Sequence, residues 1–320
     1  MNPMALWCIS PGSAELRTGE LGHGVLVETL FSGISRGTER LVFEGRVPES
    51  ETTSMRAPSQ EGDFPFPVKF GYCAVGRVME GELAGKEVFA LHPHQTQFRL
   101  PEQLLHPLPK NLPAETAILA ANMETALNIV WDSGVSAGDR VAVIGAGVVG
   151  SLVGYLVKQI PGTEVTLVDI NPERERVAIK FGCSFAEPAK APIGCDVVIH
   201  TSATEEGIAL AIESAAQEAR VVEASWYGDK AIQISLGGKF HSKRLRLISS
   251  QVGNLPPDRA NRWSHQRRIR KALELLENPV VDVLISGETD FSDIANIYES
   301  VLNDNNTLCH RIRYQDLGEA

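Results

Sequence analysis

The stretch Val141–Gly150 constrains the fold of this chain more than any other. Its sequence, VAVIGAGVVG, runs from an apolar strand pattern into the spacing G-x-G-x-x-G, and a helical pattern follows. In dinucleotide-binding units the first glycine permits a sharp turn, the second lets a pyrophosphate approach, and the third lets helix and strand pack closely. The phosphates then lie on free N–H groups at the helix N-terminus. We therefore expect cofactor contacts at Gly145, Gly147, Val148, Val149 and Gly150.

A second apolar strand pattern, Glu164–Val168, ends at Asp169. A carboxylate at this point accepts hydrogen bonds from the adenosine ribose hydroxyls and repels a 2′-phosphate. The pattern indicates a Rossmann unit that prefers NAD(H) over NADP(H). The alternative is an ordinary glycine turn followed by a surface aspartate.

Length and composition exclude several classes of protein. The 320 residues suggest about two domains, and the net charge of −10 argues against nucleic-acid binding. The five cysteines include no C-x-x-C pair, so neither a zinc ribbon nor a disulfide framework is expected. No run approaches ~18 apolar residues and no signal-peptide order is visible, so a cytoplasmic protein with no membrane partner is predicted. The basic run Arg262–Lys271 is predicted to be a solvated helix face, with a phosphate-binding patch as the alternative.

The order of patterns predicts an α/β protein in three parts. Residues 1–112 carry short strand patterns punctuated by Gly and Pro, typical of a β-rich, barrel-like catalytic domain. Residues 113–253 alternate strand and helix, which predicts a doubly wound parallel sheet that binds NAD. Residues 254–320 include a strand-like run, Val281–Ser286. This tail could join either domain, and we assign it to the catalytic one.

Two further segments carry expectations. Gly45–Pro67 is polar and rich in Pro, Ser, Thr and Glu, which predicts a long loop that could cover a cleft. Ala114–Val130 is predicted to be one helix. A substrate would meet the nicotinamide in a cleft between the two domains.

This order of parts resembles the medium-chain dehydrogenase/reductase superfamily over essentially the whole chain. The segments Ser32–Glu39, Phe64–Val78 and Ala120–Asn128 resemble the bacteriochlorophyllide hydroxyethyl dehydrogenases and their uncharacterised bacterial relatives. That branch oxidises a hydroxyethyl group to an acetyl group with NAD. The resemblance implies a GroES-like catalytic domain, a small-molecule substrate and a homodimer.

The chain departs from the zinc alcohol dehydrogenases at all three positions that supply their catalytic zinc ligands. The third of these lies four residues before a threonine that contacts the nicotinamide, and that threonine resembles Thr125. The ligand positions here hold Ser35, Tyr72 and Ala121. Zinc prefers histidine and thiolate, so the resemblance implies a zinc-independent enzyme with no metal. A different metal held by His92, His94 and Glu124 is the alternative.

Catalytic groups other than a metal are therefore expected. Tyr72 falls where a metal ligand would point into the pocket, and its hydroxyl can donate to a substrate oxygen. Ser35 and Thr38 could relay a proton, and Glu124 lies beside the expected nicotinamide position. The alternatives are a packing role for Tyr72, a turn hydroxyl at Thr38 and a helix-surface acid at Glu124.

Further cofactor contacts are expected outside the glycine turn. Arg36 occupies a position that contacts pyrophosphate in some relatives, although a surface salt bridge is the alternative. Open α/β sheets bind ligands at the carboxyl ends of their strands, and the resemblance places the segments after the last two strands near the nicotinamide. Core packing is the alternative for Trp226. The predicted contacts are Asp169, Arg36, Thr125, Thr201, Trp226 and Ser250.

Three functions fit these patterns. The favoured one is a zinc-independent, NAD(H)-dependent oxidoreductase that interconverts an alcohol and a carbonyl. The second is an NADPH-dependent quinone or enone reductase, against which Asp169 counts. The third is a non-catalytic dinucleotide-binding sensor or structural protein, which would need no proton relay.

Overall fold

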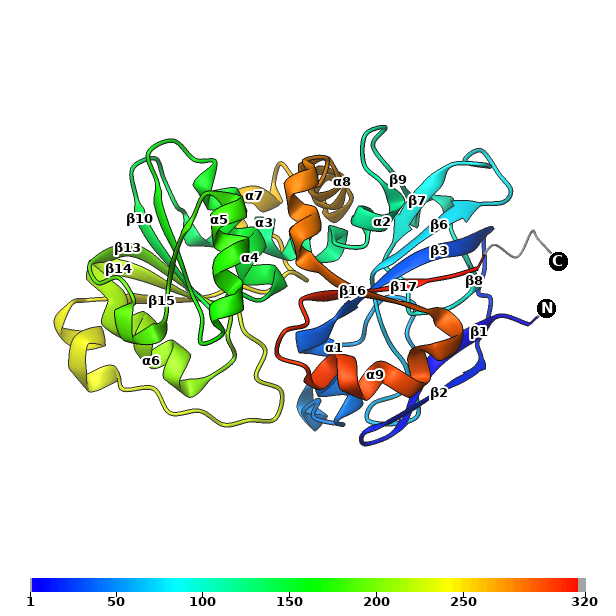
Figure 1. Ribbon diagram of the computed structural model, residues 1–320, viewed down its shortest axis with the longest axis horizontal. Coiled ribbons are helices and arrows are strands. Elements are labelled where there is room, and N and C mark those ends of the chain that lie inside the picture. The colour runs from blue at the N-terminus through cyan, green and yellow to red at the C-terminus, as the bar shows by residue number, and fades with distance from the viewer. Residues whose placement is uncertain (1, 316–320) are drawn as a thin grey trace. The chain divides into compact units, whose positions relative to one another are not determined.

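The computed structural model describes residues 2–315. The described residues divide into two compact units, one within Met1–Ala121 and Ile269–Ala320 and the other within Asn122–Arg268. In Figure 1 the first unit runs from blue to cyan and returns in orange and red, and the second is green and yellow. No helix among residues 2–315 combines the length and apolar character needed to cross a membrane.

The second unit contains a six-stranded sheet in which every pairing is parallel. The strand order β12-β11-β10-β13-β14-β15 places β10 near the middle, where its residues 141–144 are buried. Helices α4 and α5 pack against β10–β12, and α6 packs against β10, β13 and β14. The predicted doubly wound parallel sheet is confirmed. The strands are β10 Arg140–Ile144, β11 Glu164–Val168, β12 Ser184–Ala186, β13 Cys195–His200, β14 Ala215–Glu223 and β15 Arg246–Ser249.

The helices of this region begin where the sequence provides caps. The Thr204 side chain accepts a hydrogen bond from the Gly207 N–H at the start of α6, and Asn171 accepts from the Glu173 N–H before α5. Gly182 ends α5 with φ +72°, a left-handed conformation that glycine adopts without strain. The helices are α3 Ala120–Ser133, α4 Val148–Lys158, η3 Pro172–Arg174, α5 Glu175–Phe181, η4 Pro188–Lys190, α6 Glu205–Ser214, η5 Leu236–Phe240, α7 Pro257–Ala260 and α8 His265–Leu275.

The first unit is built on two sheets, as expected for a β-rich domain. A seven-stranded sheet has the order β16-β17-β3-β6-β7-β9, with β8 paired to β3, and a four-stranded sheet has the order β2-β1-β5-β4. The strands are β1 Met4–Ser10, β2 Ser13–Thr18, β3 Val25–Ser35, β4 Glu61–Gly62, β5 Val68–Lys69, β6 Ala74–Val78, β7 Glu87–Ala90, β8 Gln97–Leu100, β9 His106–Pro107, β16 Ile285–Asp290 and β17 Cys309–Arg313. The helices are α1 Arg36–Phe43, η1 Glu49–Glu51, η2 Glu102–Leu104, α2 Ala114–Ala117, η6 Pro279–Leu284, η7 Phe291–Asp293 and α9 Ile294–Asn303.

The C-terminal strands complete the larger sheet. Strand β17 pairs antiparallel with β3, with Cys309 opposite Ser35, and β16 pairs parallel with β17. Red β17 and blue β3 lie side by side in Figure 1 although about 270 residues separate them in sequence. This pairing brings the tail to the end of β3, where Ser35 begins the turn into α1.

Two predicted elements are wrong in detail. The apolar run 281–286 was expected as a strand, but residues 279–284 form the 3₁₀ helix η6 and β16 begins only at Ile285. Pro279 and the Asn278 side chain, which accepts from the Val280 N–H, start the helix, and Val281 and Leu284 then share its buried face. The predicted single helix over 114–130 is two helices, α2 and α3, with a break at 118–119.

Candidate active site

Each glycine of the turn Gly145–Gly150 is required for a different physical reason. Gly145 has φ +101°, and a Cβ there would lie 2.8 Å from the Ser202 N. A Cβ on Gly150 would lie 2.0 Å from the Gly145 carbonyl oxygen, so only glycine lets α4 pack so closely on the turn. Gly147 has open space where its Cβ would be. The backbone before α4 is thus accessible to an approaching group, as a pyrophosphate site requires.

Asp169 follows β11 and braces this turn. Its Oδ2 accepts from the Ala146 N–H at 2.7 Å, and its Oδ1 accepts from the Asn171 N–H at 2.8 Å. The carboxylate remains partly exposed, and the neighbouring Ile170 is 82% exposed. The structure therefore brings the predicted acid to the glycine turn, at the carboxyl ends of adjacent parallel strands.

Thr201 joins the same turn from β13. Its hydroxyl donates to the Gly145 carbonyl at 2.8 Å, and this hydrogen bond stabilises the turn at the first glycine. Ser250 is buried after β15 and donates to Asp132 Oδ2 at 2.6 Å, which ties it to α3. Trp226 is partly exposed beyond the end of β14, and Thr125 is partly exposed on α3. Thr201 and Asp169 thus lie at the turn, whereas the Ser250 hydroxyl is bound to α3.

Three predicted catalytic residues lie together in the first unit. The Ser35 and Thr38 side chains lie close to the Tyr72 hydroxyl and act to lower its pKa, and all three residues are partly exposed. Burial raises the pKa of the Tyr72 hydroxyl above its usual value, and the nearby Cys73 raises it further, so the phenol stays neutral. The Phe70 ring meets the Tyr72 ring edge-on at 5.9 Å and fixes its plane. A neutral phenol held in this way is a hydrogen-bond donor.

Glu124 has a different environment from the one expected of a helix-surface acid. It is 6% exposed, and its Oε1 accepts from Arg268 Nε at 2.9 Å. Arg268 also donates to Asn128 Oδ1 at 2.6 Å and to the Val252 carbonyl at 2.5 Å. Burial raises the pKa of Glu124, and Arg268 counteracts part of that rise. The carboxylate is engaged in an ion pair within the second unit.

Arg268 was missed because it belongs to a basic run that reads as solvated. It is 2% exposed, whereas its neighbours Arg267 and Arg270 are exposed. The signal that reveals it is spacing, since Arg268, Ala272 and Leu276 recur every four residues and all three are buried. The expectation of a fully solvated helix face is therefore wrong at this position.

Arg36 lies in the first unit, and two of its partners there are polar groups at and just after the C-terminal end of α9. Its Nε donates to the Leu302 carbonyl and its Nη2 donates to Asn305 Oδ1, both at 2.9 Å. The guanidinium therefore joins the start of α1 to the end of α9. These two contacts are hydrogen bonds to uncharged oxygens.

The histidines proposed as an alternative metal site have other partners. His92 Nδ1 bonds the Pro93 carbonyl, and burial lowers its pKa to about 3, so it is neutral. His94 uses both ring nitrogens, toward Ser32 and Glu39, in the first unit. Within residues 2–315 no group of three His, Cys, Asp or Glu side chains has an arrangement that could hold a metal ion. All five cysteines are buried and unpaired.

A polar cluster that sequence reasoning missed lies after β13 and β14. His200 is completely buried, and its ring bonds Glu223 Oε2 and Ser202 Oγ, each at 2.7 Å. The Tyr227 hydroxyl donates to the same Glu223 oxygen at 2.9 Å. Burial acts to raise the pKa of Glu223, but bonds from His200 and Ser225 outweigh it and lower the pKa. The cluster joins the ends of two neighbouring strands beside the glycine turn.

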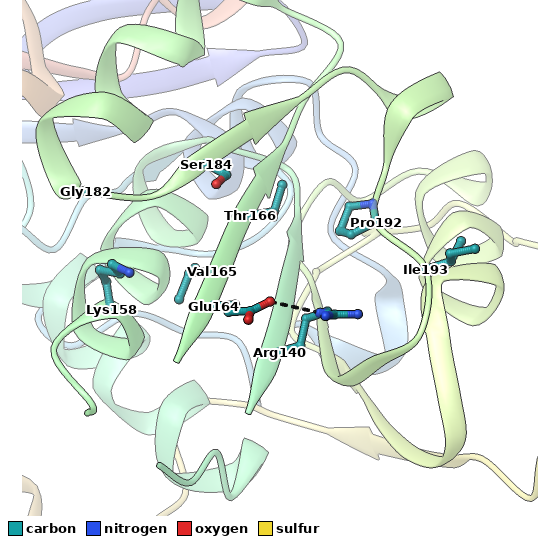
Figure 2. Close-up of a pocket in the computed structure, with 9 residues that line it drawn as sticks. All are labelled: Arg140, Lys158, Glu164, Val165, Thr166, Gly182, Ser184, Pro192 and Ile193. Carbon is teal, nitrogen blue, oxygen red and sulfur yellow. Dashed lines mark hydrogen bonds and ion pairs between the residues drawn. The ribbon is translucent and has the colours of Figure 1, made fainter. Parts of the chain in front are cut away.

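A surface cavity lies at the other end of the sheet. It has a volume of about 470 Å³ and is shown in Figure 2. Arg140 and Glu164, which line it as an ion pair, stand at the first residues of β10 and β11, and Ser184 begins β12. Because the dinucleotide end of such a sheet is its carboxyl end, this cavity is separate from the glycine turn.

The chain resembles several characterised dehydrogenases, although no protein-family model matches it. The (R,R)-butanediol dehydrogenase of Bacillus subtilis is 30% identical over 157 residues, which cover 39% of this chain and 45% of that enzyme. The D-guloside 3-dehydrogenase of Escherichia coli is 22% identical over 289 residues, or 81% of this chain and 82% of that protein. The first alignment therefore spans less than half of the relative it matches.

Solved structures share the fold over nearly the whole chain. The L-idonate 5-dehydrogenase of Escherichia coli superposes with a TM-score of 0.79 at 14% identity, covering 98% of both chains. A zinc-binding dehydrogenase of Sinorhizobium meliloti bound to NADP has a TM-score of 0.77 at 18% identity, covering 98% of this chain and 99% of that one. An Escherichia coli alcohol dehydrogenase bound to NADH also has a TM-score of 0.77. It is 16% identical and covers 98% of this chain and 99% of that one.

The fold is therefore the two-domain fold of the medium-chain dehydrogenases. In sequence and fold the chain is thus similar to dehydrogenases that are named for diol, sugar and polyol substrates. Two of the similar structures hold a nicotinamide dinucleotide, which is NADP in one and NADH in the other.

Proposed function

We propose that this protein is a zinc-independent oxidoreductase that interconverts an alcohol and a carbonyl with NAD(H). The observation that carries the proposal is the grouping of the Tyr72, Ser35 and Thr38 hydroxyls. Ser35 and Tyr72 stand at two positions where the zinc enzymes have ligands, and here their hydroxyls lie close together. The relatives' names, which include butanediol and guloside dehydrogenases, support the alcohol–carbonyl class of reaction.

The donor set does not suit zinc. Two hydroxyl groups and the methyl group of Ala121 offer neither thiolate nor imidazole, the ligands that zinc favours. Burial also keeps the Tyr72 phenol protonated, so an anionic phenolate is unavailable near neutral pH. No step of the proposed reaction is therefore assigned to a metal.

The second unit offers groups that suit a dinucleotide. The open space at Gly147 and the start of α4 would hold the pyrophosphate, and Asp169 would accept from the adenosine ribose hydroxyls. The hydride belongs to the chemistry of the nicotinamide. We propose Val148, Val149, Thr201 and Trp226 as further contacts, since they border the glycine turn or follow a strand end.

The hydroxyl groups of Tyr72, Ser35 and Thr38 would stabilise the negative charge that develops on the substrate oxygen. In the direction of reduction, hydride reaches the carbonyl carbon, and negative charge develops on oxygen that must then gain a proton. Tyr72 would donate a hydrogen bond to that oxygen, and Ser35 and Thr38 would pass the proton in from solvent. Alcohol oxidation reverses each movement, so one proton leaves by the same hydroxyl groups.

Turnover of a secondary alcohol with NAD⁺ tests this function. Polyols and sugar derivatives form the first set of substrates, because the relatives act on such compounds, and aromatic hydroxyethyl compounds form the second. Formation of reduced nicotinamide, followed by absorbance, with a carbonyl product identified by mass spectrometry would support the proposal. Binding of NADH without turnover of any alcohol or ketone would favour the non-catalytic alternative.

Purified protein should contain no stoichiometric zinc. The prediction follows from the hydroxyl and methyl groups at the three ligand positions. Elemental analysis after dialysis against a chelator measures it, and turnover should be insensitive to the same treatment. About one retained zinc ion per chain, lost together with activity, would contradict zinc independence.

Replacing Asp169 by Ala should narrow the preference for NADH over NADPH. The substitution removes the acceptor for the ribose hydroxyls and the charge that repels a 2′-phosphate. Because Asp169 also accepts from the Ala146 and Asn171 N–H groups, Asp169→Asn is the matched control, which keeps an acceptor but removes the charge. Fluorescence titration with both reduced cofactors measures the ratio. Tighter binding of NADPH by the unmodified protein would instead point to the quinone or enone reductase.

A further inference from the structure

Glu39 is a completely buried carboxylate that accepts three hydrogen bonds. Its Oε1 accepts from the Ser35 backbone N–H at 2.6 Å, and its Oε2 accepts from the Tyr298 hydroxyl at 2.6 Å. His94 Nε2 lies 3.0 Å from Oε2, and both of these side chains have zero exposure. A buried carboxylate costs free energy unless donors surround it, so this arrangement holds its members in fixed positions.

His94 extends the network toward the backbone at Gly71. Its Nδ1 bonds Ser32 Oγ at 2.8 Å, and Ser32 in turn bonds the Tyr314 hydroxyl at 2.9 Å. A Cβ on Gly71 would lie 3.0 Å from both Cδ2 and Nε2 of His94, so the imidazole packs directly on this glycine. Gly71 has φ +126°, and it immediately precedes Tyr72. The position of His94 therefore restricts the backbone that carries Tyr72.

The Glu39–His94 pair thus reaches Tyr72 along two routes. Through the Ser35 N–H, Glu39 holds the turn whose Ser35 and Thr38 side chains lie beside the Tyr72 hydroxyl. Through Gly71, His94 holds the chain one residue before Tyr72. We propose that Glu39 and His94 are positioning residues that fix the Tyr72 hydroxyl in one orientation as a hydrogen-bond donor. The consequence for turnover rests on the proposed function, but the effect on Tyr72 does not.

The negative charge of Glu39 also favours the neutral, donating form of Tyr72. After burial and Cys73, Glu39 contributes to the raised pKa of Tyr72, and the bonds from Ser35 and Thr38 oppose the rise. Removing the negative charge should therefore lower the pKa of Tyr72. Other groups whose pKa values are raised by burial and by Glu39 are Cys8, Cys73, Tyr298, Cys309 and Tyr314.

The test follows the Tyr72 ring directly by NMR, in full-length protein carrying ¹³C at tyrosine Cζ. The Tyr72 signal is identified by its loss in Tyr72→Phe. Glu39→Gln keeps the volume of the side chain but removes its charge, and His94→Asn shortens the group that packs on Gly71. Both should move or broaden the Tyr72 signal. Glu44→Gln, at the partly exposed end of the same helix, should leave it unchanged.

A second variant covers the case in which Glu39→Gln fails to fold. Tyr298→Phe removes one donor to Glu39 and keeps the ring that packs edge-on against Phe43 at 5.3 Å. It should also move or broaden the Tyr72 signal, by a smaller amount. A Tyr72 signal that is unchanged in every folded variant of Glu39, His94 and Tyr298 would overturn the proposal.

Kinetics separate this inference from the proposed function. In Glu39→Gln, kcat should fall about tenfold to a hundredfold, the loss that outer hydrogen-bond partners cause in other sites, while KM for the dinucleotide stays the same. A changed Tyr72 signal without any turnover by the parent protein would uphold the positioning role and contradict the oxidoreductase. Unchanged kcat in a folded variant with a changed Tyr72 signal would overturn the kinetic part of the proposal.

Discussion

Tyr72→Phe should lower turnover about 10²–10³-fold, or roughly 3–4 kcal/mol of transition-state stabilisation, because it removes one preorganised donor to the developing oxyanion. The ring and its edge-on contact with Phe70 remain, so the melting temperature should change little. The measurement compares kcat, KM and thermal unfolding of the variant and the parent with the best alcohol substrate.

The loss of turnover in Tyr72→Phe should not depend on pH in the neutral range. Burial raises the pKa of Tyr72 above its ordinary value, so the hydroxyl stays protonated through the neutral and mildly alkaline range. The ratio of parent to variant turnover should therefore be constant from about pH 6 to pH 10, the reference pKa of tyrosine. Tyr155→Phe is the matched control, since it removes a hydroxyl from a ring in α4 that packs on Phe181 of α5. Unchanged turnover in Tyr72→Phe would leave Tyr72 as a packing residue.

Arg268→Met should destabilise the protein by about 3–5 kcal/mol, the cost of leaving one partner of a buried ion pair without the other. Glu124 would keep a buried carboxylate, and the Asn128 and Val252 oxygens would lose their donors. Denaturant unfolding followed by fluorescence measures the change. Arg267→Met is the control, because that exposed guanidinium lies over the Trp263 ring, a contact worth at most about 1 kcal/mol at exposed sites.

The defect should depend on pH and on Glu124. Loss of Arg268 removes a group that lowers the pKa of Glu124, so burial would raise that pKa further in the variant. Between the unfolded and the folded pKa the native state then binds more protons, so stability falls as pH rises through that window. The variant should be less impaired at pH 5 than at pH 7. Adding Glu124→Leu should recover much of the loss, and a defect that persists unchanged would contradict the ion-pair explanation.

Two elements show where the local sequence pattern is insufficient to predict the secondary structure. Strand β12 has only three residues, too few for a period to be read, and it exists because it pairs with β11. The run 281–286 has the β-branched residues of a strand, but Pro279 and the Asn278 cap start a 3₁₀ helix instead. In both cases a contact outside the apolar pattern decides the conformation.

The burial of charged residues is also not predictable from the local sequence. Arg268 is surrounded in sequence by arginines that are exposed, so its burial follows from Glu124, more than a hundred residues earlier. Nothing in the local sequence marks Glu39 as buried, yet Tyr298 and His94 enclose it. Pairing of charges across long sequence separations leaves no local pattern, and only the folded chain brings the partners together.

The sequence by itself determined the parallel sheet, the glycine turn and the acid after the second strand, because spacing within about thirty residues specifies each of them. Its resemblance to the zinc enzymes also implied that two of their three ligand positions hold hydroxyl side chains here, Ser35 and Tyr72. The tertiary structure alone decided that β17 joins β3 and that the Tyr72 hydroxyl meets Ser35 and Thr38. It also decided that a buried glutamate contacts the Ser35 N–H and that a buried histidine packs on Gly71, next to Tyr72. These features depend on strand pairing and burial between distant segments, and such contacts form only when the chain has folded.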